Sequence, residues 1–462
     1  MKNLIRSSSD QRGVIIIYEL LIIFIFSTVM VATISYAVSQ LKAISAAVRQ
    51  EAAFQIAEAG VNYYQWRLAH YPEDFEDGTG GAGPYVHDYV DADTEETIGH
   101  YSLDITAPPV GSTIVTIRST GYTTADPNIK KTVTVKYGIP SLAKYAFLTN
   151  SDVYIGSSST ISGELHSNGG IRFDGVGNAP ITSAKSTYTC QPISGCSPAQ
   201  TKPGIWGSAP AATQAFWDYP VPNVDFSTIT SDFATIKADA QDSGIYLPPD
   251  SRRGYSLVFN ANGTVSVYEV RTVKSESGYD FDGDYTNTST SYNSRTLLFT
   301  QAIPANGLIF AEDDTWVEGT VNGRALVVAA TLPHQQNSSP SIMIQNDITY
   351  AAKDGTDTLG LIGQDNVLIS RSAPDDLEID AAIVAQYGAY GQYYYPNNIK
   401  DTLTVYGAVS SFGVAGTYWT GGRGDSGYPT RNTTYDANLL YGPPPSFPIS
   451  SSGYQQISWS SD

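Results

Sequence analysis

The chain has 462 residues, and 41% of them are hydrophobic, which is enough for sizeable buried cores and excludes a wholly disordered tail. Its 26 Lys and Arg against 45 Asp and Glu give a formal net charge of −19, so a nucleic acid, whose phosphates require clustered cations, is not expected as a partner. Charged residues make up only 15%, whereas 41 Gly, 32 Tyr and 25 Pro are typical of an extracellular, β-rich protein with many tight turns.

The amino terminus combines a basic segment with a long apolar one. Residues 1–13 are polar and include Lys2, Arg6 and Arg12, and residues 14–38 are apolar with the single charge of Glu19. About 20 apolar helical residues cross the hydrocarbon core of a bilayer, so 14–38 is predicted to be a transmembrane helix in membrane lipid. Because basic flanks stay cytoplasmic, everything after residue 38 is predicted to lie outside the cytoplasmic membrane, in a single-pass protein at the cell surface.

The apolar segment continues into an amphipathic helix. No proline occurs between Val14 and His70, so one continuous helix of about 85 Å is predicted at 1.5 Å per residue. Beyond residue 38, apolar residues recur every three or four positions and predict one face that packs against a partner. These residues are Leu41, Ile44, Val48, Ala52, Ile56, Ala59, Tyr63 and Trp66.

Two motifs in this region resemble a known family. Gly13 precedes the apolar run and a glutamate follows within it, which resembles the class III leader of type IV pilins, and the segment AFQIAEAGVNYYQWRLAHYP (53–72) is similar to PilX-like minor pilins. The resemblance covers about the first 138 residues and implies a long helix packed on a small antiparallel sheet. It also implies a leader peptide that prepilin peptidase removes after Gly13, a methylated Val14 as first mature residue, and association with other pilin subunits.

Glu19 is the residue expected to serve assembly. In the pilin family a glutamate at the fifth mature position pairs with the amine of a neighbouring subunit, whereas Glu19 is sixth if Val14 is first. A carboxylate in lipid is costly unless it is paired, which makes Glu19 a functional candidate. The alternative is a membrane anchor in which Glu19 snorkels toward the interface.

Two different segments follow the helix. Residues 73–98 are acidic and Gly-rich and are predicted to form a solvated loop, with calcium binding as the alternative. Residues 99–137 contain the alternating runs HYSLDIT, STIVTIRSTGY and KKTVTVKYG, which predict an antiparallel meander that buries the exposed half of the helix. Residues 39–138 are therefore expected to form a pilin-like unit of helix and meander.

The larger part of the chain has a different pattern. Residues 139–180 and 301–420 consist of short apolar runs broken by polar turns. Leu361, Ile383 and Val409 are separated by 22 and 26 residues, which fits successive coils of a right-handed parallel β-helix with variable turns. The alternative is an antiparallel sandwich, but two-residue hairpin turns are mostly missing from these segments.

A second resemblance points the same way. Residues 306–413 are similar to a β-helix domain that is found attached to PilX-like amino termini. The predicted fold class is therefore α+β and mostly β. A transmembrane and pilin-like long α-helix with a small antiparallel sheet is expected to precede a large right-handed parallel β-helix.

Residues 181–300 are predicted to be an insertion that covers an end or a side of the β-helix. It contains a hairpin that turns at Asn262 and Gly263. It also contains a predicted helix within 225–244, whose apolar face is formed by Phe226, Ile229, Phe233, Ile236 and Ala240. Residues 421–462 are expected to form a Gly- and Pro-rich tail along the β-helix surface, because Pro-rich sequence does not propagate strands.

Cys190 and Cys196 are the two cysteines of the chain. A disulfide that closes this short loop is predicted, and it requires an oxidising compartment. The alternative is a pair of reduced thiols in a surface loop.

Three carboxylates stand within five residues at Asp280, Asp282 and Asp284. A hard cation requires several oxygen ligands at once, so these residues form a candidate Ca2+ site. Their spacing differs from that of an EF-hand, and a solvated loop is the alternative. No other cofactor is expected.

Aromatic residues are concentrated between 387 and 395. Exposed aromatic rings stack on sugars or on other surfaces, so a binding surface for a surface polysaccharide or for a host or partner cell is predicted. Its residues are Trp316, Tyr387, Tyr390, Tyr393, Tyr394, Tyr395 and Trp419. The alternative is a ladder of stacked tyrosines along the β-helix.

No catalytic residues are assigned, and the chain is not expected to be an enzyme. The resemblance implies a type IV pilus-like minor pilin or pilus-assembly component, which enters a filament through its helix and displays the β-helix for filament assembly or adhesion. The alternative is a membrane-anchored surface β-helix protein that binds or cleaves polysaccharide and never enters a filament.

Overall fold

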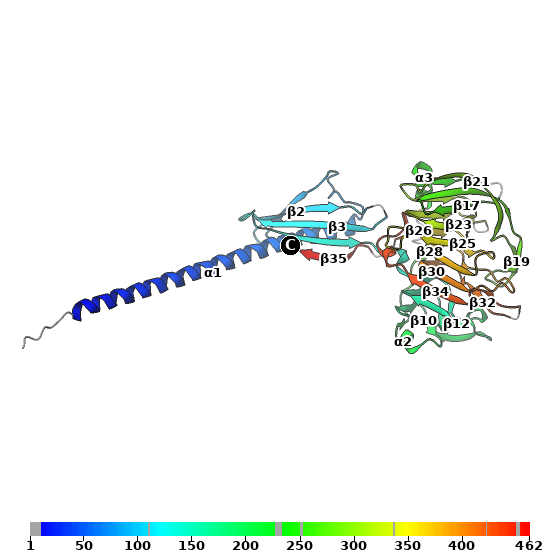
Figure 1. Cartoon of the computed structure of the whole chain (residues 1–462), viewed down its shortest axis with the longest axis horizontal. Helices are drawn as coiled ribbons and strands as arrows, with labels where there is room; N and C mark the ends of the chain where they lie inside the picture. The colour runs from blue at the N-terminus through cyan, green and yellow to red at the C-terminus, as the bar shows by residue number, and fades with distance from the viewer. Residues whose placement is uncertain are drawn as a thin grey trace, which may run out of the picture. The chain divides into compact units, whose positions relative to one another are not determined.

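The computed structural model describes residues 11–109, 111–226, 233–249, 253–335, 338–421, 423–449 and 453–462, with the backbone alone for 11–14 and 193. The chain divides into two compact units. The smaller unit contains 1–106, 116–136 and 456–462, and the larger unit contains 107–115 and 137–455. Figure 1 shows the long helix in blue and the strands of both units.

The smaller unit is built on one helix, α1 (Gln11–His70), of 60 residues. At 1.5 Å per residue it is about 90 Å long, so the prediction of a continuous helix is confirmed. The helix ends immediately before Tyr71 and Pro72, where proline would remove a helical N–H donor.

Five strands form the sheet of the smaller unit, in the order β1-β2-β3-β4-β35. Their bounds are β1 (Tyr85–Val90), β2 (Thr97–Thr106), β3 (Ile114–Thr123), β4 (Lys130–Gly138) and β35 (Gln455–Ser461). The pair β2 and β3 is antiparallel, as the predicted meander of 99–137 requires, and β1 adds to β2 in the same way. Two strands were not predicted: β1 lies in the expected acidic loop, and β35 lies in the expected tail. The tail prediction is wrong for its last residues, because 455–461 alternates polar and apolar side chains and pairs as an edge strand.

The face of α1 that packs on the sheet differs from the predicted stripe. The buried residues of the helix are Ala53, Ile56, Ala57, Gly60, Val61, Tyr64 and Leu68. Of the predicted stripe only Ile56 is buried, whereas Leu41, Ile44 and Val48 are exposed. The reason is that the sheet covers only the last part of the helix, where small residues allow close approach.

The larger unit contains strands stacked in parallel ladders. The first ladder consists, in stacking order, of β16 (Ile245–Leu247), β22 (Leu308–Ala311), β24 (Arg324–Ala329), β26 (Thr358–Gly363), β28 (Asp376–Ala385), β30 (Thr402–Ser411), β5 (Phe147–Thr149), β8 (Leu165–Ser167), β11 (Ile181–Ser183) and β15 (Trp217–Asp218). Leu361 pairs with Ile383, and Ile383 pairs with Val409, so the register predicted for these three residues is confirmed. All three are buried in the core.

This ladder also reveals an unexpected chain order. The chain enters the larger unit in the middle of the stack, because β5 pairs with β30, whose sequence lies more than 250 residues later. From β5 the strands stack in chain order through β8 and β11 to β15, which is one end of the ladder. The chain then forms β16 at the opposite end, and β22, β24, β26 and β28 stack from there to β30. In Figure 1 the labels β26, β28, β30, β34 and β10 follow one another along the unit. We call the contact between β30 and β5 the seam.

A second ladder also crosses the seam. Ile379 in β28 pairs with Val405 in β30, and Val405 pairs with Thr433 in β34 (Thr430–Tyr435). Thr433 then pairs with Ile161 in β7 (Ser159–Ser162), which in turn pairs with β10 (Val176–Gly177).

The third ladder stops at the seam. It contains β17 (Tyr255–Asn260), β23 (Thr315–Val321), β25 (Ile342–Tyr350), β27 (Val367–Ile369), β29 (Tyr390–Gly391) and β31 (Ala415–Gly416). The strands β6 (Val153–Ile155), β9 (Ile171–Phe173) and β14 (Ile205–Trp206) form a separate three-stranded sheet. The seam is thus closed by backbone pairing along two ladders and not along the third.

Antiparallel pairs occupy the remainder of the larger unit. They involve β12 (Thr187–Cys190) with β13 (Gln200–Pro203), β17 with β18 (Thr264–Val273), β18 with β21 (Tyr292–Ala302), β19 (Glu276–Tyr279) with β20 (Tyr285–Thr288), and β32 (Tyr418–Trp419) with β33 (Ser426–Gly427). The hairpin predicted at Asn262 and Gly263 is confirmed by β17 and β18. The unit as a whole has mixed pairing, so the fold class is observed at a coarser level than predicted, as a long apolar helix followed by a large β-rich unit.

The range 181–300 does not behave as a separate insertion. Its strands β11, β15, β16 and β17 belong to the parallel ladders at the two ends of the stack. The helices are short: α2 (Ala211–Gln214) and α3 (Phe233–Ser243). In α3 the predicted face is confirmed for Phe233, Ile236 and Ala240, while Ile229 lies outside the described residues.

Candidate functional site

The first part of α1 presents a large apolar surface. Most of its bulky side chains between 15 and 48 are more than half exposed, including Ile15, Ile16, Ile17, Leu20, Leu21, Ile22, Ile23, Phe24, Ile25, Phe26, Val29, Met30, Val31, Ile34, Leu41, Ile44 and Val48. We call these residues the apolar helix surface. By length and composition this helix can cross a membrane. The residues predicted to pack on the sheet, 41–48, instead extend the apolar surface beyond residue 38.

The predicted processing and assembly residues lie at the start of this surface. Gly13 and Val14 have helical backbone within α1, and residues 1–10 of the predicted leader lie outside the described residues. Glu19 is exposed, and no hydrogen bond or ion pair to it is formed by any residue that the structure describes. A single carboxylate therefore stands on an apolar surface without a partner from the described part of its own chain.

A polar network fixes the last turns of α1 to the acidic segment that follows. The Arg67 Nε atom donates to Asp74 Oδ2 at 2.8 Å, and the Tyr63 hydroxyl donates to Asp77 Oδ1 at 3.1 Å. The His87 Nε2 atom lies 2.7 Å from Asp77 Oδ2. The prediction of a solvated loop is wrong at these carboxylates, because they face cationic and phenolic groups of the same unit.

The charge of Asp74 is stabilised within this network. Burial alone would raise the pKa of Asp74, but hydrogen bonds from the N–H groups of Gly78 and Glu76 and from the Arg67 guanidinium lower it below its usual value. A carboxylate whose pKa is lowered in the folded state stabilises the fold above its unfolded pKa and loses that contribution as the pH falls. The Arg67–Asp74 pair therefore holds the end of α1 to the acidic segment at neutral pH and loses that contribution in acid.

Cys190 and Cys196 form a disulfide in the larger unit. The bond closes the loop between β12 and β13, which pair antiparallel from Thr187 with Pro203 to Cys190 with Gln200. Both sulfur-bearing residues are buried beside Tyr188. The disulfide thus ties the last residue of β12 to the loop that leads to β13.

The predicted calcium residues do not form a cluster. Asp280 Oδ1 accepts the backbone N–H groups of Asp282 at 3.1 Å and Asp284 at 2.9 Å, so it caps the turn between β19 and β20. Asp282 and Asp284 are exposed. Across the described ranges, no group of three or more His, Cys, Asp or Glu side chains is placed to hold a metal ion. The interpretation as a Ca2+ site is therefore wrong for this arrangement, since one carboxylate is used by the backbone.

The carboxyl group of Asp314 is expected to make the stability of the larger unit depend on pH. Burial raises the pKa of Asp314 to about 6, and neighbouring Asp313 and Asp365 act in the same direction against a hydrogen bond from the Ser341 N–H. Between the unfolded pKa near 4 and pH 6, the folded state holds the proton more tightly, so stability falls as the pH rises. In the parent chain the free energy of unfolding should therefore fall between pH 4 and pH 7. We expect this fall to be about 2 kcal/mol smaller in Asp314→Asn, because the amide keeps an acceptor for the Ser341 N–H without ionising.

The measurement is the free energy of unfolding of the larger unit at pH 4 and pH 7, for both proteins. Glu378→Gln, at an exposed ion pair with Lys353, is the control and should leave the pH dependence nearly unchanged. Equal pH dependence in the parent chain and in Asp314→Asn would contradict the assignment.

The predicted aromatic surface is largely core. Trp316, Tyr390 and Tyr395 are buried, and Tyr393, Tyr394 and Trp419 are partly buried. The Tyr395 hydroxyl lies 2.8 Å from the Thr288 hydroxyl, and the Trp316 Nε1–H donates to the Thr290 carbonyl at 2.8 Å. Tyr387 alone of the seven is exposed, and its ring stacks on His334. The predicted binding surface is therefore wrong in most of its residues, because the strands turn these rings inward.

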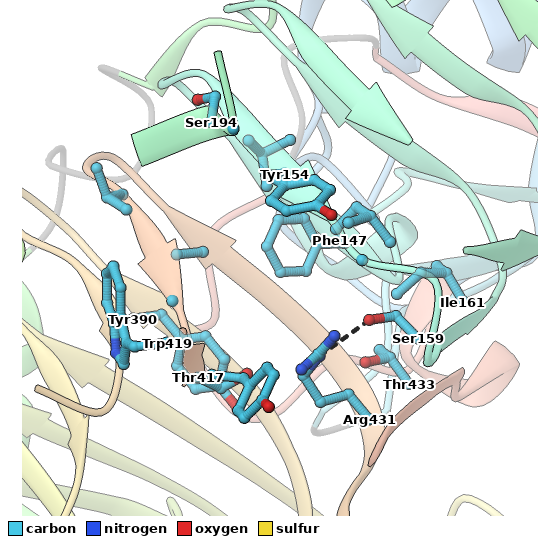
Figure 2. A pocket seen from close by; sticks show the side chains of 18 of the residues that line it. Phe147, Tyr154, Ser159, Ile161, Ser194, Tyr390, Thr417, Trp419, Arg431 and Thr433 are labelled. Atoms are coloured by element: carbon cyan, nitrogen blue, oxygen red, sulfur yellow. Dashed lines mark hydrogen bonds between the residues drawn. The ribbon is translucent and has the colours of Figure 1, made fainter. Parts of the chain in front are cut away.

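Sequence reasoning missed a cavity of 670 Å3 at the seam (Figure 2). Most of its walls come from 147–161 and from 403–433, two segments that are far apart in sequence, and residues of 191–195 and Tyr390 complete them. Arg431 lies in this cavity, and nothing in its local sequence distinguishes it from other arginines. Only the pairing of β30 with β5 and of β34 with β7 brings the walls together.

Comparisons with solved structures give a remote likeness. No protein-family model matches the chain, and no curated protein matches it. The crystal structure of the competence-associated pilin ComZ from Thermus thermophilus is similar over 90% of this chain and 97% of that chain, with 13% sequence identity and a TM-score of 0.30.

Proposed function

We propose that this chain is a non-enzymatic minor pilin, or pilus-assembly component, of a type IV pilus-like filament. The observation that carries the proposal is α1, a 60-residue helix with an exposed apolar first part and a last part buried against a sheet. The larger unit, which we interpret as a right-handed parallel β-helix, is the part that the filament would display at the cell surface for assembly or adhesion.

The apolar helix surface requires an apolar partner. Contiguous apolar patches of more than a few hundred Å2 are rare on monomeric soluble proteins and mark sites of association or membrane contact. Residues 15–38 are long enough to cross a bilayer, which supports insertion in the cytoplasmic membrane before assembly. The exposed residues 41–48 extend past the hydrocarbon core, which favours packing against neighbouring helices over lipid contact alone.

Glu19 is the polar residue on which the proposed assembly depends. A charged side chain near the bilayer centre is costly and is found paired or facing a protein interior. In our proposal prepilin peptidase cuts after Gly13, and Glu19 pairs with the free amine of Val14 on a neighbouring subunit. The one-residue offset from the family pattern is less than one turn of a helix.

The amino terminus of the protein in filaments tests this proposal. We expect mass spectrometry of sheared surface filaments to find a peptide that begins at methylated Val14. Gly13→Leu should retain the leader and reduce the protein in filaments at least tenfold. The matched control is Gly81→Leu, because a side chain there meets no atom closer than 4.0 Å.

An unprocessed protein would contradict the proposal. An intact Met1 found only in membranes, with Gly13→Leu without effect, would contradict the pilin assignment. It would favour the second candidate, an anchored surface protein that binds polysaccharide, which the cavity at the seam independently supports.

A further inference from the structure

The cavity at the seam has a structural cause. Two of the three ladders continue across the seam, through Val409 with Phe147 and through Thr433 with Ile161. The third does not, because β31 and β6 belong to different sheets. The cavity is lined by residues on both sides of this interruption, including Val153–Gly156 and Val414–Trp419. Its volume of 670 Å3 is within the range of small-ligand sites.

Arg431 supplies a cation without a counter-ion. Its guanidinium donates from Nε to Ser159 Oγ at 2.9 Å, from Nη1 to the Tyr428 carbonyl at 2.8 Å, and from Nη2 to Ser158 Oγ at 3.4 Å. These bonds use three of its five N–H groups. No carboxylate of the described residues forms an ion pair with it.

Two other arginines of the larger unit pair with carboxylates, and the Arg324 guanidinium, which has no carboxylate partner among the described residues, donates to four backbone carbonyls. Arg172 pairs with Asp174 at 2.9 Å, and Arg295 pairs with Glu318 at 2.6 Å. In a chain with a net charge of −19, Arg431 differs from these because no described carboxylate neutralises it and two of its N–H groups are left for an external anion. The planar fork of its free N–H groups suits a carboxylate.

A second polar group lining the cavity also lacks a partner. Tyr390 is 3% exposed, and its hydroxyl forms no hydrogen bond with any described residue. A buried hydroxyl without a partner costs free energy, but the Tyr390 oxygen has almost no accessible surface, so a ligand in the cavity does not reach it. Figure 2 shows Tyr390 among the residues around the cavity, together with Arg431 and its hydrogen bond to Ser159.

Aromatic rings and small hydroxyls complete the lining. Tyr154, which is 41% exposed, and the partly buried Tyr418 and Trp419 contribute ring surfaces. The Trp419 Nε1–H is already used by the Gln392 carbonyl, so the ring contributes its apolar face. Thr417 and Thr420 add hydroxyl groups. Flat rings beside hydroxyls are the chemistry that binds a sugar ring.

Asp152 sets the orientation of the ligand. Its carboxylate also lines the cavity and accepts the Gly170 N–H at 2.7 Å. It forms no ion pair with Arg431 in the described structure. An anionic group is therefore attracted to Arg431 and repelled by Asp152, next to which neutral hydroxyls are favoured.

We propose that this cavity binds an acidic saccharide, with the carboxylate of a uronic-acid residue on Arg431 and the sugar rings against Tyr154, Tyr418 and Trp419. A single carboxylate among neutral hydroxyls suits the cavity better than an acidic peptide, because the strongly negative chain repels consecutive anionic groups. The inference rests on the proposed function only in placing the larger unit outside the cell, where acidic polysaccharides occur.

Calorimetric titration of the full-length protein in detergent tests the inference. The probes are a trisaccharide of two galactose residues and one galacturonic acid residue, which carries a single carboxylate, and the galactose trisaccharide of the same linkage. We expect the acidic probe to bind at least tenfold more tightly, and Arg431→Gln to abolish this preference. Arg431→Lys, which keeps the charge and loses the fork, should give an intermediate value. Arg271→Gln is the control, since Arg271 pairs with Glu269 and does not line the cavity.

One further variant and one further probe keep the outcomes distinct. Tyr154→Ala changes an exposed ring, so the fold should be retained, and we expect weaker binding of both trisaccharides. Equal binding of the acidic and neutral probes, no binding of either, or tighter binding of a triaspartate peptide would overturn the inference. Because the titration needs no filament, a protein that binds the acidic probe but is absent from filaments contradicts the proposed function alone.

Discussion

Gly121→Val is expected to separate α1 from the sheet of the smaller unit and to lower its free energy of unfolding by about 3 kcal/mol. Gly121 lies in β3 directly under the helix. A Cβ atom there would lie 2.3 Å from the Ala53 carbonyl oxygen and 2.3 Å from the Ala57 nitrogen. These are backbone atoms of α1, so the clash can be relieved only by moving the helix. Valine favours strands, so the loss cannot come from strand propensity.

Hydrogen exchange of peptides from 53–68 measures this effect within the smaller unit alone. The control is Ser102→Val in β2, because Ser102 alternates with the buried Tyr101 and Leu103 and so points away from the helix. We expect the control to change exchange by less than about 0.5 kcal/mol. Unchanged protection of 53–68 in Gly121→Val would show that the helix and the sheet do not pack this closely.

Ile44→Asp is expected to prevent incorporation into filaments while leaving the monomer intact. Ile44 is 59% exposed and contacts no core of its own chain, so an aspartate there has little effect on folding. In a bundle of pilin helices the same charge would be desolvated without a partner, at a cost of several kcal/mol. Since about 1.4 kcal/mol is a factor of ten, the protein in sheared filaments should fall at least tenfold.

Quantitative immunoblotting of sheared filaments and of membranes separates assembly from expression. Gln50→Asp introduces the same charge at an exposed polar position of the same helix and serves as the matched control. We expect the control protein to reach filaments at the parental level. If Ile44→Asp is also present at that level, the exposed residues 41–48 are not an assembly surface.

Local periodicity predicted the elements that depend on neighbouring residues. The unbroken apolar and helix-forming run of α1, the hairpin at Gly263 and the register of Leu361 with Ile383 follow from spacing alone, and the structure contains all three. The side of α1 that meets the sheet could not be predicted in this way. Apolar residues occur on more than one side of the helix, and only the position of the sheet decides which of them are buried.

The candidate site residues also differ in whether local sequence alone could identify them. Glu19 could be identified because a charge in an apolar run is visible in sequence. The tyrosines near 390 could not be sorted, because Tyr395 points into the core and Tyr387 does not, although both stand in one aromatic cluster. Arg431 was missed because its surroundings are created by pairing between segments more than 250 residues apart.

The position of β35 means that the sheet of the smaller unit is completed only by the last strand of the chain. This strand follows the whole larger unit in sequence, yet it forms the edge of the five-stranded sheet beside β4. During synthesis, the β4 edge of this sheet therefore stays unpaired until the larger unit and then β35 have been made. A chain that stops early would expose the unpaired N–H and C=O groups of β4, which invite pairing with another chain. The closed five-stranded sheet beside α1 thus depends on a strand that is synthesised after the larger unit.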